Sequence, residues 1–294
     1  MKYVIGLDIG GTKIHSLVAE WDEDFLDARK LPKIVKSNRA TLQNKKDGDK
    51  FFKEITAEIH ALIEEFGEEN VERIGMGIAG PLSRDRVILN PPNLPLKNFP
   101  VLQNLKNNFN LPVYVGNDAN CFSWAEHLFG ASAAASSTVG VTLGTGVGGG
   151  IVLDRDGKSF LWDGYHGCSA EIGHMILDGE RSFEDLCSSR AQYLWGGRDP
   201  RVIEQEARAE NKEYQDVYKK FGFWLGVGIA NTINVINPEI VVVGGSISKA
   251  WDLFEEEMNA SAKKYIISTQ AKKTKIVRAK LGDDAGALGA AYLI

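Results

Sequence analysis

Apolar residues recur along this chain with two periods, and these predict short strands that alternate with amphipathic helices. Alternating or continuous apolar residues predict strands at 3–7, 14–20, 74–78, 111–115, 139–143 and 241–243. Apolar positions three and four residues apart predict helices at 49–66, 119–129, 182–195, 213–236, 249–265 and 284–293. This alternation is typical of an α/β protein.

Length and composition narrow the class of protein. The 294 residues exceed what one core usually supports, so two domains or two lobes of one fold are expected. The net charge of −5 argues against nucleic acid as a partner, because binding phosphates requires a basic face. The cysteines are odd in number and scattered, at 121, 168 and 187, which suits a reducing cytoplasm rather than a disulfide framework.

No targeting or membrane segment is expected. The first strand begins at about Tyr3, with no signal peptide before it. The most apolar long region, 221–243, is interrupted by three asparagines, Pro238 and Glu239, so it does not resemble a membrane span. We therefore expect a cytoplasmic protein with no membrane partner.

Glycine-rich turns follow three of the predicted strands. Gly10 and Gly11 lie between Asp8 and Lys13, Gly144-Thr145-Gly146 follows the strand at 139–143, and Gly244-Gly245 follows the strand at 241–243. A single turn of this kind is more often a plain hairpin than a phosphate loop. Its repetition in both halves indicates a duplicated fold whose glycine turns bind one polyphosphate from two sides across a cleft.

Asn117 and Asp118 come directly after the strand at 111–115, at the end where open α/β sheets place their chemistry. Asp118 could accept the proton of a substrate hydroxyl, and Asn117 could orient that hydroxyl. On these residues alone, helix capping by Asp118 is an equally good interpretation.

Two further groups of polar residues are candidates for binding. Asn93 offers an amide within a proline-rich loop, where a buried turn amide is the commoner role. Glu171 and His174 are three residues apart and can project from one side of a helical turn, which suits sugar hydroxyls or a metal. An exposed Glu with a packed His is the alternative.

Together these stretches resemble the ROK family (repressors, open reading frames and kinases), which are sugar kinases with the actin-like, ribonuclease H-like fold. The resemblance lies in five motifs that occur in the family's order: Leu-Asp-Ile-Gly-Gly-Thr-Lys at 7–13, Gly-Asn-Asp-Ala-Asn at 116–120, Leu-Gly-Thr-Gly-Val-Gly-Gly-Gly at 143–150, Glu-Ile-Gly-His at 171–174 and Asn-Pro-Glu-Ile-Val-Val-Val-Gly-Gly at 237–245.

The resemblance implies a role for each candidate residue. Asp118 would be the catalytic base. The sugar would be bound by Asn93, Asn117, Asp118, Glu171, His174 and Glu184. Nucleotide binding would fall to Asp8, Gly10, Gly11, Thr12, Lys13, Gly144, Thr145, Gly146, Gly244 and Gly245, with Mg²⁺ held near Asp8 through water.

One departure from the family pattern concerns zinc. Many members follow the Glu-x-Gly-His motif with cysteines that, with the histidine, bind a structural zinc. Here 175–185 contains no cysteine, and Ser182 stands where the last zinc cysteine would be. We therefore expect no zinc, since a structural site requires four ligands and Cys187 alone cannot supply them.

The resemblance implies an ATP- and Mg²⁺-dependent carbohydrate kinase, glucokinase-like, that converts glucose to glucose 6-phosphate. N-acetylglucosamine, N-acetylmannosamine or fructose are alternative acceptors, and polyphosphate is an alternative donor. A sugar-binding regulator without catalysis is the alternative of another class, disfavoured because family repressors carry a helix-turn-helix segment where only Met1 and Lys2 stand here. A homodimer or other homo-oligomer is expected.

The implied fold has two lobes with the active site in the cleft between them. A small lobe, 1–117, would carry the first phosphate loop, and a C-terminal helix at about 282–294 would pack back on it. A large lobe, 118–281, would carry the second phosphate loop, the sugar site and the adenosine motif. Hinges are expected near Gly116 and before the C-terminal helix.

Overall fold

The computed structural model describes residues 1–22, 24–25 and 29–294. The chain divides into two compact units, described separately below. The first comprises 1–134, 150–169 and 283–294, and the second comprises 135–149 and 170–282. The lobe boundaries that the sequence predicts stay a prediction.

A five-stranded sheet forms the centre of the first unit, with the order β3-β2-β1-β4-β7. Its strands are β1 (Lys2–Ile9), β2 (Lys13–Trp21), β3 (Ile34–Thr41), β4 (Val71–Ile78) and β7 (Val113–Asn117). β1, β4 and β7 are mutually parallel, whereas β2 and β3 are antiparallel to their neighbours. The register pairs Ile9 with Ile78 and Ile78 with Asn117, so the three parallel strands end at one edge.

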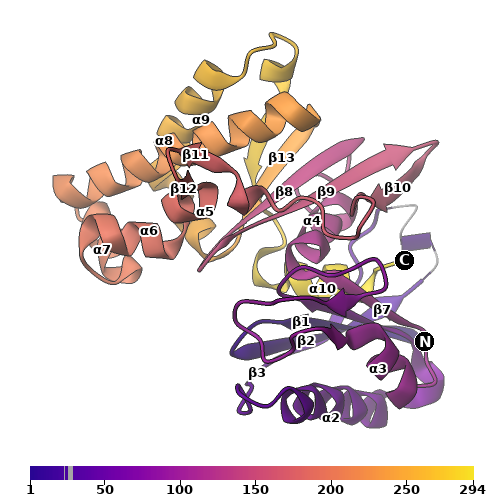
Figure 1. The fold of residues 1–294 in the computed structure, drawn as a ribbon. Helices are drawn as coiled ribbons and strands as arrows, with labels where there is room; N and C mark the ends of the chain where they lie inside the picture. Colours follow the sequence, from indigo (N-terminus) through magenta and orange to yellow (C-terminus); the bar gives the residue numbers. More distant parts are fainter. Residues whose placement is uncertain (23, 26–28) are drawn as a thin grey trace. The chain divides into compact units, whose positions relative to one another are not determined.

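Helices cover both faces of this sheet (Figure 1). On one face lie α2 (Gly48–Phe66) and α3 (Val101–Asn108), and the buried face of α2 predicted from its apolar period joins the main hydrophobic core. On the other face lie α4 (Asp118–Phe129) and α10 (Ala285–Ala291). The small pairing of β5 (Val87–Ile88) with β6 (Phe99–Pro100) completes the unit. Most of β9 (Val147–Arg155) and all of β10 (Lys158–Leu161), which pair with each other, also fall within it.

Close approach of α10 to the sheet depends on glycines. A Cβ at Gly75 would collide with the carbonyl oxygen of Ala290, and one at Gly6 would collide with that of Ala287. The helix backbone therefore lies against the strand backbones, which larger side chains would prevent. This explains why the C-terminal segment of the chain is rich in alanine and glycine.

The second unit contains parallel strands and a layer of helices. β13 (Ile240–Gly244) pairs in parallel with β8 (Ser137–Leu143) and with β14 (Lys275–Arg278). These strands belong to a five-stranded sheet with the order β10-β9-β8-β13-β14, which also contains β9 and β10. This order repeats that of the first sheet, as a duplicated fold requires. The longer helices are α7 (Pro200–Arg208), α8 (Lys212–Ile236) and α9 (Trp251–Tyr265), of which α8 and α9 pack on each other (Figure 1).

The single helix predicted at 182–195 is wrong. The structure has two helices there, α5 (Phe183–Cys187) and α6 (Ser189–Gly196), separated at Ser188. The backbone of Ser188 is extended, with φ −109° and ψ 172°, so helical hydrogen bonding cannot continue through it. The short hairpin of β11 (Ile176–Asp178) and β12 (Arg181–Ser182) precedes these helices.

Five 3₁₀ turns complete the described secondary structure: Glu68–Asn70, Ile172–His174, Ser246–Ala250, Ala271–Lys273 and Gly282–Asp284. Within the described part of the chain, no helix has both the length and the apolar content needed to cross a membrane.

Candidate functional site

Asn117 and Asp118 lie where β7 ends and α4 begins, as the sequence predicts. The Oδ1 atom of Asn117 accepts hydrogen bonds from the amides of Ala119 at 2.9 Å and Asn120 at 3.2 Å. Asn117 is therefore the helix cap, and the capping role considered for Asp118 belongs mainly to its neighbour. The Nδ2 atom of Asn117 donates to the carbonyl of Gly80 at 3.1 Å, which fixes the amide plane.

Within the first unit, the carboxyl groups of Asp118 and Asp8 are close enough for the charge of Asp118 to affect the pKa of Asp8. Burial raises the pKa of Asp118 above its ordinary value. Burial, and then the charge of Asp118, raise the pKa of Asp8 to about 7, against a smaller opposing effect of Arg39. A carboxylate whose pKa is raised is a stronger base, so this environment suits proton transfer from a substrate.

The first glycine turn joins β1 to β2. The amide of Gly10 donates to the carbonyl of Lys13 at 3.0 Å, which closes the hairpin. A Cβ at Gly11 would lie 2.7 Å from the carbonyl oxygen of Asn93, so the structure places Asn93 against this turn. Asn93 is exposed, and the buried-amide interpretation is wrong for it. Thr12 and Lys13 are also exposed and accessible to an anion.

The second glycine turn lies in the second unit, between β8 and β9. The amide of Gly144 donates to the carbonyl of Gly146 at 3.0 Å, and Thr145 is exposed. Glu184 accepts a hydrogen bond from the amide of Val147 at 3.0 Å through Oε2, and a Cβ at Gly146 would collide with this same oxygen. Glu184 is predicted to bind the sugar, and its hydrogen bond to Val147 also holds the predicted phosphate-binding turn in place.

Glu171 and His174 lie on one side of the 3₁₀ turn at Ile172–His174, as their spacing predicts. The Oε2 atom of Glu171 and the Nε2 atom of His174 are 3.9 Å apart. Both side chains are exposed. The packed-histidine alternative is therefore wrong, and the pair can present a carboxylate and an imidazole to a polyol.

The third glycine turn follows β13 and borders a cavity. Gly245 has φ 84°, and a Cβ there would collide with the carbonyl of Leu143, so the position requires glycine. Next to it, Ser246 and Ile247 help to line a cavity of about 440 Å³. The opposite walls come from α6, α7 and α8 and include Gln192, Glu204 and Tyr218.

Gln192 is the residue of this cavity that sequence reasoning missed. Its side chain is 1% exposed, and its Nε2 atom is buried without a hydrogen-bond partner among the described residues. Contact of this amide with the Tyr218 hydroxyl lowers the pKa of Tyr218, against the larger opposing effect of burial, but the contact does not have the geometry of a hydrogen bond. Nothing in a lone glutamine of a short helix could have signalled this, because the missing partner appears only in the folded structure.

The carboxylates of the first unit fit the chemistry of Mg²⁺. This ion is usually bound by one or two carboxylates with substrate phosphates and water, which matches Asp8 beside Asp118.

Among the residues that the structure describes, no group of three or more His, Cys, Asp and Glu could hold a metal. Ser182 caps α5 in a capping box with Asp185, and Cys187 is buried in the core.

The repeated strand order in two mixed sheets, with glycine turns at the strand ends, defines the actin-like two-lobe fold. The chain belongs to the ROK family, whose family model matches residues 4–294. The resemblance drawn from five sequence motifs is thereby confirmed.

Known relatives include kinases and regulators. A crystal structure of a ROK family glucokinase from Streptomyces griseus, in complex with glucose and AMPPNP, matches with a TM-score of 0.81 at 27% identity, covering 98% of each chain. The N-acetyl-D-glucosamine kinase of Vibrio cholerae is 31% identical, over 98% of each chain. The xylose repressor of Bacillus subtilis is 24% identical over 99% of this chain and 77% of the repressor.

Proposed function

We propose that this protein is a hexose kinase that transfers the γ-phosphate of ATP to glucose, at the 6-hydroxyl. The observation that carries the proposal is the half-buried carboxyl of Asp118, which lies where β7 ends and α4 begins and has a raised pKa. The similarity to a glucokinase crystallised with glucose and an ATP analogue supports the choice of acceptor and donor.

Asp118 takes the proton of the acceptor hydroxyl as that oxygen attacks the γ-phosphorus. The phosphorus–oxygen bond to ADP breaks as the new bond forms, and the proton passes to the carboxylate. Asn117 is fixed by three hydrogen bonds, so its remaining amide hydrogen can orient the sugar without reorganisation.

The glycine turns supply backbone amides to the phosphates. In the first unit these come from Gly10, Gly11, Thr12 and Lys13, and in the second unit from Gly144, Thr145 and Gly146. Asp8 is the residue that would hold Mg²⁺, which offsets phosphate charge when bound. Glu184 holds the second glycine turn in place through its hydrogen bond to the amide of Val147. We infer that a sugar bound to Glu184 therefore affects the position of the turn that binds the phosphates.

The cavity beside Gly245 is proposed to receive the nucleoside. Ligands of open α/β sheets bind outside the carboxyl ends of parallel strands, which is where Gly244 and Gly245 lie. The unpaired Nε2 atom of Gln192 would donate to an acceptor nitrogen of the base. A buried donor without a partner is costly, so a ligand acceptor here contributes to affinity.

Sugar recognition is proposed to involve Asn93 in the first unit and Glu171, His174 and Glu184 in the second. Carboxylates, an amide and an imidazole are the groups that bind vicinal hydroxyls. A cytoplasmic homo-oligomer is the expected state of the protein, and this stays a prediction.

The test is ADP release with Mg·ATP across glucose, N-acetylglucosamine, N-acetylmannosamine, mannose and fructose, with a blank lacking sugar. The same panel with polyphosphate, followed as sugar phosphate, tests the alternative donor. Turnover highest with glucose and ATP supports the proposal. Turnover only with another sugar retains the kinase and replaces the acceptor.

A sugar-binding regulator is the second candidate, favoured by the similarity to the xylose repressor. Calorimetric binding of a sugar from the panel, with no ADP or sugar phosphate formed, would support it. Robust turnover would exclude a purely regulatory role.

A further inference from the structure

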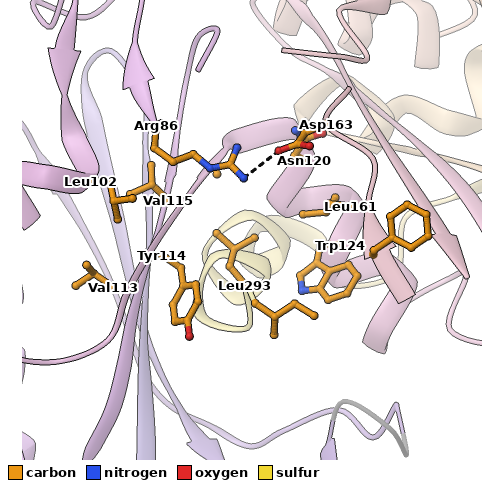
Figure 2. A pocket seen from close by; sticks show the side chains of 13 residues that line it. Arg86, Leu102, Val113, Tyr114, Val115, Asn120, Trp124, Leu161, Asp163 and Leu293 are labelled. Atoms are coloured by element: carbon orange, nitrogen blue, oxygen red, sulfur yellow. Dashed lines mark ion pairs between the residues drawn. The ribbon is translucent and has the colours of Figure 1, made fainter. Parts of the chain in front are cut away.

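A second cavity lies within the first unit, beside the unpaired edge of β7. Its volume is about 230 Å³. Its apolar wall is formed by Leu102, Val113, Val115, Trp124, Leu161 and Leu293, which come from α3, β7, α4, β10 and the C-terminal segment (Figure 2). The Nε1 atom of Trp124 donates to the carbonyl of Tyr292 at 2.8 Å, so the indole offers this cavity its ring and not a free donor.

One polar group in the cavity wall has no partner. Asn120 is 6% exposed, and its Oδ1 atom is buried with no hydrogen bond in the described part of the chain. Buried carbonyl oxygens in native proteins nearly always accept a hydrogen bond, and an unsatisfied one is costly. The cavity therefore lacks a hydrogen-bond donor at this point.

The charged residues of the cavity neutralise each other. Arg86 and Asp163 form an ion pair at 2.9 Å, and both side chains are about one-third exposed. Figure 2 shows this pair together with the apolar side chains that line the same cavity. A neutral pair beside an apolar wall favours an uncharged ligand over an ion, because an ion would lose hydration without a counter-charge.

We propose that this cavity binds a small uncharged aromatic molecule that carries one N–H or O–H donor, with the donor bonded to Asn120 Oδ1 and the ring against Trp124. The volume agrees with this size, since an engineered apolar cavity of about 150 Å³ in another protein binds benzene. A ligand of one substituted ring or two fused rings fills 230 Å³. The donor satisfies the one unpaired acceptor, and the ring replaces water at the apolar wall.

The position of the cavity connects it to the candidate site. Its walls include β7, which ends at Asn117, and α4, which begins at Asp118. The ligand thus contacts both elements that hold the proposed base, without contacting the base itself. A ligand bound there can therefore alter the turnover of the enzyme. This effect on turnover rests on the proposed function, whereas binding of the ligand does not depend on it.

The test compares two ring systems of equal shape, indole and benzofuran, by calorimetry and ligand-observed NMR on the full chain. Indole has an N–H donor where benzofuran has an acceptor oxygen. Indole should bind about tenfold more tightly, the effect of one hydrogen bond to an otherwise unsatisfied group. Asn120→Leu should reduce this ratio to about one without loss of thermal stability, because it removes the unpaired acceptor at similar volume.

A second variant, Leu161→Trp, fills the cavity while keeping Asn120, and it should weaken both compounds. Failure of both compounds to bind the native protein would overturn the proposal, and so would equal or tighter binding of benzofuran. A discrimination that persists in Asn120→Leu would contradict the role of the amide. These outcomes are independent of kinase activity, so a protein inactive on every sugar can still bind indole.

Discussion

Asp118 raises the pKa of Asp8, although the two residues are far apart in the sequence. Asp8 lies near the end of β1 and Asp118 directly follows β7, with β4 between the two strands. The parallel register brings the ends of these strands to one edge, so two carboxyl groups share one partly buried region. This relationship supplies both a proposed base and a proposed metal ligand, and it leads to the first two predictions.

Replacing Asp118 by asparagine should lower kcat by about 10² to 10⁴, because the variant keeps the shape of the side chain but cannot accept the proton. Sugar-dependent ADP release measures the effect, and an unchanged thermal unfolding transition shows that the fold is intact. Asp85→Asn replaces an exposed aspartate of the same unit and should leave kcat unchanged. A normal rate in Asp118→Asn would remove Asp118 from its role as base.

The stability of the protein should fall as pH rises from about 4 to about 7, through the contribution of Asp8. The pKa of this residue is about 7 in the native state and 3.8 in the unfolded reference, so in this window the native state binds a proton that the unfolded state has released. For one group the slope is at most about 1.4 kcal/mol per pH unit.

Asp8→Asn is neutral throughout and should lose this slope, so its stability relative to the native protein should increase between pH 4 and 7. Urea unfolding in metal-free buffer at several pH values measures the difference. Asp85→Asn is the matched control, and its pH profile should follow that of the unaltered chain. Parallel profiles for Asp8→Asn and the native protein would refute the raised pKa.

Gln192→Leu should separate nucleotide binding from stability. The change removes a buried donor that has no partner, so the free energy of unfolding should rise by about 1 kcal/mol. The same change removes the proposed contact to the base, so the dissociation constant for ADP should rise about tenfold. Calorimetry and urea unfolding measure the two effects.

Gln205→Leu, at an exposed position of α7, is the control for both measurements and should alter neither. If Gln192→Leu loses stability and keeps its affinity for ADP, then the amide is structural and the nucleoside proposal loses this residue.

Gly75→Ala should destabilise the first unit by about 3 kcal/mol, because the new methyl group meets the carbonyl of Ala290 and forces α10 away from β4. Chemical denaturation followed by circular dichroism measures this. Gly179→Ala is the control, since a Cβ there meets open space and costs only the strain of φ 58°, about 1 kcal/mol. Equal losses in the two variants would show that the approach of α10 is not tight.

The candidate site was predictable where chemistry follows from adjacent residues. The three glycine turns, the strand end at Asn117 and the pairing of Glu171 with His174 follow from local rules of backbone freedom and side-chain spacing. The choice between Asn117 and Asp118 as helix cap was not predictable, because both residue types cap helices and the outcome depends on the carbonyl of Gly80, which lies on another segment.

The sequence by itself determined the α/β alternation, the family and the helical face of α2, because apolar periodicity and glycine positions act over a few residues. Tertiary structure alone decided that the polar segment 34–41 becomes β3. This segment forms a strand because it pairs with β2, and its own sequence has no apolar alternation that predicts a strand. Tertiary structure also decided that Asn120 and Gln192 are buried without partners. Whether a polar atom finds a partner depends on contacts between distant segments, and no local pattern records them.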